Sequence, residues 1–235
     1  MGLRNEKDRK NGPLWRFRSR NISTAQTPRG DGYRSASRIV TAVQHRNSGL
    51  PGKYRIIGGR WRGRKMAIAD VAGVRPTPNR VRETLFNWLA KPVENAVCLD
   101  LFAGSGALGI EALSRGAASV VFVEKNRRAS SHLLDQLNVI GAEAEVVCGD
   151  ALKFLQGPVR KFDIVFLDPP YQSTLLAPAM QALEANGWLG KDAFVYAEKP
   201  AREPLPGMPP GWVLWRDSKA GQVGYYLFRR QTPPG

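Results

Sequence analysis

The chain has 235 residues, which is enough for one sizeable domain with an appendage but not for two large domains. Its formal net charge of +15 favours a polyanionic partner, above all nucleic acid. No apolar run approaches the ~18 residues of a membrane span, and the two cysteines and two histidines lack metal-ligand spacing. We therefore expect a cytoplasmic, monomeric protein with no metal.

Residues 1–50 differ in composition from the rest of the chain. They contain 11 Lys and Arg against three acidic residues, and they show no sustained apolar period. This composition is typical of a disordered basic extension. A start codon assigned too far upstream would explain the same segment, and both explanations stay open. No chemistry is assigned to it.

Residues 51–75 are predicted to form a basic β-hairpin arm. The stretch "KYRIIGGRWRGRK" has short β-prone runs broken by glycines, and six of its 13 residues are Lys or Arg. Basic side chains can follow phosphates while the interleaved aromatics stack on bases. A hairpin that is merely charged and solvated is the alternative. The candidate RNA-binding residues are Arg55, Arg60, Trp61, Arg62, Arg64 and Lys65.

The next stretch, "RPTPNRVRETLFNWLA", is predicted to be a helix. Thr77 can cap its N-terminus, and apolar residues recur every four positions from Val81 to Leu89. Arg82 then falls on another face. Residues 75–77, just before the helix, can reach a ligand.

From Ala96 onward, strand patterns alternate with helical ones, which indicates a mostly parallel sheet. Two final strands follow with only a turn at 219–221 between them. Residues 76–235 are therefore predicted to form an α/β, doubly wound, Rossmann-like domain with a C-terminal antiparallel hairpin. The expected strands are 97–101, 119–124, 144–148, 162–168, 193–198, 212–217 and 223–228, and the expected helices are 107–114, 127–139 and 175–185.

A glycine-rich loop follows the first of these strands. In "LDLFAGSGALGIEAL", Gly104, Gly106 and Gly109 have the GxGxxG spacing and open a helix. Glu124 lies 20 residues after Gly104, at the end of the next strand, where a carboxylate can accept hydrogen bonds from ribose hydroxyls. A simple packing turn with a surface glutamate is the alternative. The strand context and the placed acid together favour an adenosine cofactor.

NAD and S-adenosylmethionine are the two candidates for this cofactor. Asp100, beside the loop, would repel a pyrophosphate but suits an ammonium and a sulfonium. Little chain remains for the substrate domain of a dehydrogenase, so we expect S-adenosylmethionine. Asp150 ends the third strand, where it can bind the adenine amino group, cap a helix, or do both. The candidate cofactor residues are Asp100, Phe102, Gly104, Gly106, Glu124, Asp150 and Ala151.

The motif "DPPY", residues 168–171, ends the fourth strand. An exocyclic amine conjugated with a ring is a poor nucleophile, and two acceptors on its hydrogens can make it reactive. The Asp168 carboxylate and the Pro169 carbonyl are the candidate acceptors. The two prolines fix the backbone, and Tyr171 can stack on a base. A rigid turn is the alternative, but the motif follows the cofactor loop in order. Asp168, Pro169, Pro170 and Tyr171 are therefore the candidate catalytic residues.

These motifs resemble the amino-group class of S-adenosylmethionine-dependent methyltransferases. The stretches "RIIGGRWRGRK", "RPTPNRVRETLFNWL", "LDLFAGSGALGIEALSRGA", "DPPY" and "AGQVGYYL" are similar, in order and wording, to the RsmD family of bacterial 16S rRNA guanine-N2-methyltransferases. The resemblance implies a Rossmann-like fold and methylation of a guanine in 16S rRNA, in assembling small subunits. It also implies the cofactor and acceptor residues given above.

Two rival functions remain at this point. The residues alone do not separate guanine N2 from adenine N6, cytosine N4 or a glutamine amide, so a DNA amino-methyltransferase is one alternative. That enzyme normally needs a target-recognition domain for which this chain has little room. A non-catalytic RNA-binding or ribosome-assembly factor is the other, although an intact DPPY motif argues against it.

Overall fold

The structure is a computed structural model that describes residues 15–18, 52–72, 76–171 and 173–231. Its helices are α1 (Asn79–Trp88), α2 (Ala107–Ser114), α3 (Arg127–Ile140), α4 (Ala151–Phe154) and α5 (Leu176–Ala185). Its strands are β1 (Trp15–Arg18), β2 (Lys53–Arg55), β3 (Lys65–Ala67), β4 (Val97–Asp100), β5 (Ser119–Glu124), β6 (Glu145–Cys148), β7 (Phe162–Leu167), β8 (Leu189–Pro200), β9 (Trp212–Ala220) and β10 (Val223–Arg230).

The main sheet has the strand order β1-β6-β5-β4-β7-β8-β10-β9. Strands β4 to β8 run parallel, whereas β10 is antiparallel to both β8 and β9. The sequence-based prediction of a mostly parallel, Rossmann-like sheet closed by an antiparallel pair is confirmed. Strand order reverses at β4, because β5 and β6 lie on one side of it and β7 and β8 on the other. Ligands of open α/β sheets bind at such a point.

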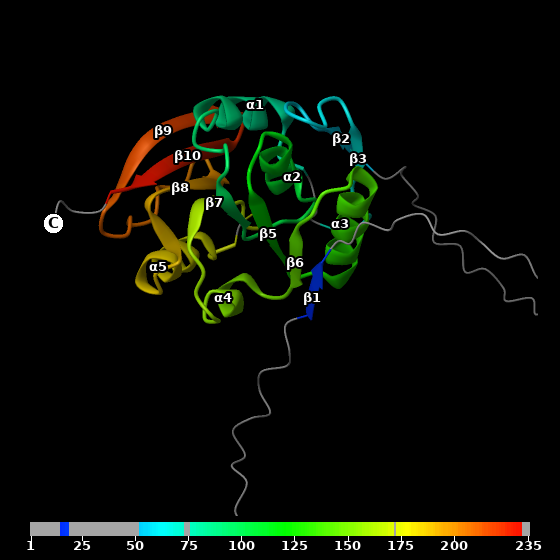
Figure 1. Ribbon diagram of the computed structural model, residues 1–235. Coiled ribbons are helices and arrows are strands. Elements are labelled where there is room, and N and C mark those ends of the chain that lie inside the picture. The colour runs from blue at the N-terminus through cyan, green and yellow to red at the C-terminus, as the bar shows by residue number, and fades with distance from the viewer. Residues whose placement is uncertain (1–14, 19–51, 73–75, 172, 232–235) are drawn as a thin grey trace, which may run out of the picture.

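Helices cover both faces of this sheet, as Figure 1 shows. Helices α1, α2 and α3 pack with the β2–β3 hairpin over one face, whose core includes Phe86, Ile110 and Phe166. Helices α4 and α5 cover the other face, whose core includes Phe154 and Trp188. Within the described part of the chain, no helix has the length and apolar character needed to cross a bilayer.

The start of α1 differs from the prediction. The N-cap residue is Pro78, and no side chain caps the helix. The Thr77 hydroxyl instead donates to Oδ2 of Asp168, at 3.4 Å, and the Thr77 carbonyl accepts from Nε of Arg82. Arg82 is fully buried because Glu111 on α2 supplies its counter-charge. The segment before α1 is thereby tied to the end of β7.

The predicted hairpin is present, because β2 and β3 pair antiparallel. It is not a free arm, however, since Tyr54, Ile56, Trp61 and Met66 are buried in the core. Glu111 on α2 also accepts the backbone N–H groups of the hairpin at residues 57 and 58. The hairpin is therefore part of the main body of the domain.

The prediction of a disordered N-terminal extension can be compared with the structure only at residues 15–18. These four residues form β1 and pair antiparallel with β6 at the edge of the sheet. An edge strand presents unpaired backbone N–H and C=O groups, which favour the addition of such a segment. The rest of the predicted extension, residues 1–14 and 19–50, lies outside the described residues.

Candidate active site

The glycine loop leaves the sheet at the position where strand order reverses. After β4, the N–H of Leu101 donates to the carbonyl of Phe166 on β7. Two residues later, the N–H of Ala103 donates to the carbonyl of Val123 on β5. The loop is thus hydrogen-bonded to both neighbouring strands at their carboxyl ends. This is where a crevice for a nucleotide-like ligand is expected.

Glycine is required where the loop enters α2. Gly106 has φ of 73°, and a Cβ there would lie 2.4 Å from Cδ1 of Leu133. The carboxylate of Asp100 accepts the N–H of Gly109 at 3.0 Å. Asp100 is only 2% exposed, and burial raises its pKa to about 7. Asp100 therefore holds the loop against α2, and its predicted role beside the methionine end of a cofactor stays a prediction.

Glu124 lies at the end of β5, directly beside the loop. Its two carboxylate oxygens accept the N–H of Gly104 at 2.8 Å and that of Asn126 at 2.6 Å. Each carboxylate oxygen has a second lone-pair site, so the half-buried carboxylate can still accept two ribose hydroxyls. The residues present therefore fit an adenosine group. Phe102, another of the predicted cofactor residues, is half-buried in the same glycine loop.

Asp150 adopts one of its two predicted roles. Its Oδ1 accepts the N–H groups of Leu152 and Lys153, so Asp150 caps α4, whose first residue is Ala151. Its Oδ2 lies 3.9 Å from Nζ of Lys125. This second oxygen is free of backbone partners in the described structure, which keeps the predicted contact with an adenine amino group chemically available.

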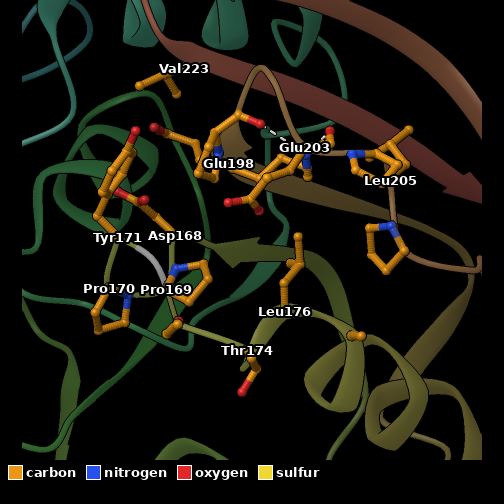
Figure 2. Close-up of a pocket in the computed structure, with 16 residues that line it drawn as sticks. Asp168, Pro169, Pro170, Tyr171, Thr174, Leu176, Glu198, Glu203, Leu205 and Val223 are labelled. Carbon is orange, nitrogen blue, oxygen red and sulfur yellow. Dashed lines mark hydrogen bonds between the residues drawn. The ribbon is translucent and has the colours of Figure 1, made fainter.

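The DPPY motif follows β7 and forms one wall of a pocket of about 390 Å³. The opposite wall comes from the end of β8 and from residues 203–206, and the first turn of α5 contributes Leu176. Figure 2 shows Tyr171, Asp168 and Glu198 at one end of this pocket and Leu205 at the other. Tyr171 is 60% exposed, so its ring is free to stack on a ligand. The volume is in the range of roughly 300–1,000 Å³ typical of small-ligand pockets.

Three acidic residues, Asp100, Asp168 and Glu198, lie at the start of the glycine loop or in this pocket, and the charge of Asp168 affects the pKa values of the other two. Asp168 is half-buried, and burial raises its pKa while the Thr77 hydroxyl lowers it. Burial, and then the charge of Asp168, raise the pKa of Glu198, which is only 7% exposed. The charge of Asp168 also raises the pKa of Asp100. Asp168 is thus close enough to the Asp100 carboxyl group to affect its pKa, while it also lines the pocket. Its catalytic role stays a prediction.

Sequence reasoning did not single out Glu198 or the segment 203–206. Glu198 occurs in a strand pattern, "AFVYAE", at its carboxyl end, like the acids of the other strands. That position was the available signal, because parallel strands end at the same edge of a sheet. Segment 203–206 has no comparable signal. Within the described residues, no group of three His, Cys, Asp or Glu side chains could hold a metal ion.

The hairpin's basic residues form an exposed surface that we call the basic face. Its members are Arg55, Arg60, Arg62, Arg64 and Lys65. Trp61 is different, because it is buried, its backbone N–H donates to Oγ of Ser114, and the Arg60 guanidinium covers its ring at 4.1 Å. Tyr54 is also buried. The predicted stacking of these two aromatics on bases does not fit their burial, which leaves the basic face for phosphates.

The fold, the glycine loop and the DPPY pocket together define a methyltransferase of the Rossmann-like class. A solved structure described as "Putative methyltransferase yhhF from Escherichia coli" superposes with a TM-score of 0.72 and is 49% identical, covering 77% of this chain and 99% of that one. The enzyme class expected from the sequence is confirmed.

A family model described as "Conserved hypothetical protein 95" matches residues 54–229. The Escherichia coli K12 protein "Ribosomal RNA small subunit methyltransferase D" is 49% identical over 182 residues, which cover 77% of this chain and 92% of that protein. The protein with the same description from Haemophilus influenzae is 43% identical and covers 76% of this chain and 94% of that protein. The chain belongs to this family, and the resemblance noted in its sequence is confirmed.

Proposed function

We propose that this protein transfers the methyl group of S-adenosylmethionine to the exocyclic N2 amine of a guanine in the RNA of the small ribosomal subunit. One observation carries the proposal: Asp168 directly follows β7, next to the strand that leads into the glycine loop, and lines a pocket of about 390 Å³ together with Tyr171. The descriptions of the relatives as small-subunit rRNA methyltransferases support the RNA substrate and argue against the DNA alternative.

The cofactor would be held along the carboxyl ends of β4, β5 and β6. Glu124 would accept hydrogen bonds from the ribose hydroxyls. Asp150 would accept a hydrogen bond from the adenine amino group through Oδ2, the oxygen that does not cap α4. Gly104 and Gly106 allow close approach of the ligand to the backbone. When bound, S-adenosylmethionine supplies an electrophilic methyl group.

The acceptor side of the reaction would be prepared by the DPPY motif. The Asp168 carboxylate and the Pro169 carbonyl would each accept one N2 hydrogen, which turns the amine lone pair toward the methyl group. Tyr171 would stack on the base, an interaction worth about 1–3 kcal/mol. Holding the two reacting atoms in line is the larger effect, because such positioning can lower a barrier by roughly 7–11 kcal/mol. Asp168 can then take or relay the proton that the methylated nitrogen releases.

RNA binding would use the basic face of the hairpin. Arg60, Arg62 and Arg64 are exposed in a stretch of 13 residues with six cations. Contacts with phosphates would offset the few kcal/mol that it costs to flip a base out of a structured RNA. We further propose that the substrate is an assembling small subunit and that the enzyme acts as a monomer.

The test uses the full chain, labelled S-adenosylmethionine, and small subunits from cells that lack this methylation. The rRNA is digested with nuclease, and mass spectrometry identifies the modified nucleoside. The expected product is N2-methylguanosine at a single position. A label on adenosine or cytidine, or on protein, would contradict the proposal, and so would cofactor binding without transfer to any RNA.

A further inference from the structure

The pocket contains a second buried carboxyl group besides Asp168. Glu198 lies at the end of β8, is 7% exposed, and lines the pocket together with Asp168. The two acids are close enough to interact, because the charge of Asp168 raises the pKa of Glu198, and the Thr77 hydroxyl donates to Oδ2 of Asp168 at 3.4 Å. Figure 2 shows both acids at the same end of the pocket. Asp168 and Glu198 therefore face one small volume, whereas Glu203, the third acid that lines the pocket, is exposed.

Glu198 is held in a defined orientation. The phenol of Tyr196, which has no exposed surface, donates to Oε1 of Glu198 at 2.8 Å. This bond occupies one oxygen and fixes the rotation of the carboxyl group, so Oε2 remains the oxygen available to a ligand in the pocket. Tyr196 is thus a positioning residue for Glu198.

No cation pairs with Glu198 among the residues that the structure describes. Lys199, the next residue, donates its ammonium hydrogens to the carbonyls of Pro200 and Glu203 instead. Burial, and then the charge of Asp168, raise the pKa of Glu198 to about 8, so the carboxyl group of the free site is mostly protonated near neutral pH. Buried acids with such raised pKa values cluster at functional sites. A ligand that brings hydrogen-bond donors into the pocket would stabilise the carboxylate.

We propose that Glu198 determines the choice of base by accepting the N1–H of the target guanine while Asp168 and the Pro169 carbonyl accept from N2. This inference rests on the proposed function. In guanine, N1–H lies next to the exocyclic amine, so two adjacent positions donate. In adenine and cytosine, the ring nitrogen beside the amine is an acceptor and would face the Glu198 carboxylate without a hydrogen. A site built around a substrate N–H rejects analogues that lack it.

The test compares guanine with 2-aminopurine at the methylated position, in small subunits reconstituted with the altered rRNA. 2-Aminopurine keeps the N2 amine but has no hydrogen on N1. Assayed above the Glu198 pKa of about 8, where the group is a carboxylate, the wild-type enzyme should prefer guanine by about 100-fold or more in kcat/KM, because the Glu198 carboxylate faces a bare N1 in the analogue. In Glu198→Gln, the amide can donate to that N1, and the preference should fall below about 10-fold.

The control is Glu143→Gln, which removes an exposed carboxylate beyond the C-terminal end of α3 and should keep the wild-type preference. Cofactor affinity should be unchanged in both variants. A Glu198→Gln enzyme that keeps the wild-type preference would overturn the inference while leaving the proposed function intact. A wild-type enzyme that leaves guanine N2 unmethylated would instead overturn the proposed function.

A second variant decides the matter if Glu198→Gln is inactive on both bases. Tyr196→Phe keeps the carboxyl group but removes the phenol that orients it. We expect it to bind the cofactor normally and to reduce the preference for guanine by roughly 3- to 10-fold, the effect of one lost hydrogen bond. An unchanged preference in this variant would also overturn the role of Glu198.

Discussion

Arg82 on α1 and Glu111 on α2 form an ion pair in which neither side chain is exposed, with Nη1 of Arg82 3.3 Å from Oε2 of Glu111. The same carboxylate accepts the N–H groups of Ile57 and Gly58 at 2.8 and 2.7 Å. One buried group therefore connects the hairpin, α1 and the helix that follows the glycine loop. The basic face is held by this connection in a fixed position relative to the site.

Removing the charge of Glu111 should destabilise the fold. Glu111→Gln leaves Arg82 buried without its counter-charge, and we expect the free energy of unfolding to fall by roughly 3–5 kcal/mol. Urea unfolding followed by circular dichroism measures this change. The matched control is Arg115→Met, which removes the 20%-exposed second partner of Glu111 and should cost about 1 kcal/mol or less. Equal losses in the two variants would contradict the role given to the buried pair.

Replacing Asp168 should greatly reduce turnover and spare cofactor binding. Asp168→Ala removes one of the two acceptors for the amine, and loss of one preorganised polar contact costs roughly 10²- to 10³-fold in kcat. The measurements are single-turnover methyl transfer to small subunits and calorimetric titration with the cofactor. A variant with a near-normal rate would show that another group prepares the amine.

The ring of Tyr171 should matter more than its hydroxyl. Tyr171 is 60% exposed at the pocket, so its contribution should come from stacking on the base. Tyr171→Ala should lower kcat/KM by about 5- to 150-fold, which corresponds to ~1–3 kcal/mol of stacking. Tyr171→Phe serves as the control and should stay within about 3-fold of the wild type, since it keeps the ring. Equal losses in Ala and Phe would point to the hydroxyl instead.

The basic face should dominate the salt dependence of RNA binding. Replacing Arg60, Arg62 and Arg64 by Gln should weaken binding and flatten the slope of log K against log salt by about 2–3, because each phosphate contact contributes ~0.7–0.9. Binding is measured by filter retention at several salt concentrations. The double variant Arg216→Gln/Lys219→Gln, on exposed β9 positions, is the control. A slope that changes equally per charge in both variants would mean that binding follows total charge only.

Asp100 should make stability depend on pH in the absence of cofactor. Burial raises its pKa from 3.8 to about 7, so the folded state binds its proton more tightly than the unfolded state does. The free energy of unfolding should therefore fall as pH rises from about 4 to about 7. Asp100→Asn, which can still accept the Gly109 N–H, should make this slope shallower. The control variant Glu143→Gln should leave the slope of stability against pH unchanged. If Asp100→Asn also kept the wild-type slope, Asp100 would not be the group responsible.

Local patterns predicted the elements best where an apolar run is clearly bounded by polar or glycine residues. The predicted bounds of α2 (107–114) and β5 (119–124) agree with the structure. Strand β8 is longer than predicted, because Leu189 to Asp192 extend it beside β7 despite a polar, glycine-containing sequence. Helix α4 was foreseen only through Asp150 as an N-cap, and its bounds were not predicted, because its four residues are too few for a periodic pattern.

The site could be predicted where a motif carries it, and not where it depends on tertiary contacts. The glycine loop, Glu124 and DPPY lie at the ends of the neighbouring strands β4, β5 and β7, and therefore at the same edge of the sheet. Thr77 was assigned to a helix cap, whereas it contacts Asp168, 91 residues later. The burial of Trp61 depends on contacts with α2, so its sequence neighbours, all cationic or glycine, suggested exposure.

The backbone of the hairpin rests directly on the end of α2 at Gly59, where φ is 73° and a Cβ would lie 1.8 Å from the carbonyl oxygen of Ser114. No other amino acid fits without separating the two elements. The cationic loop is consequently seated on the same helix that opens with the glycine motif, at its opposite end. If the hairpin binds phosphates as proposed, the distance between those phosphates and the DPPY pocket would be set by this contact and would limit which nucleotide can reach the site.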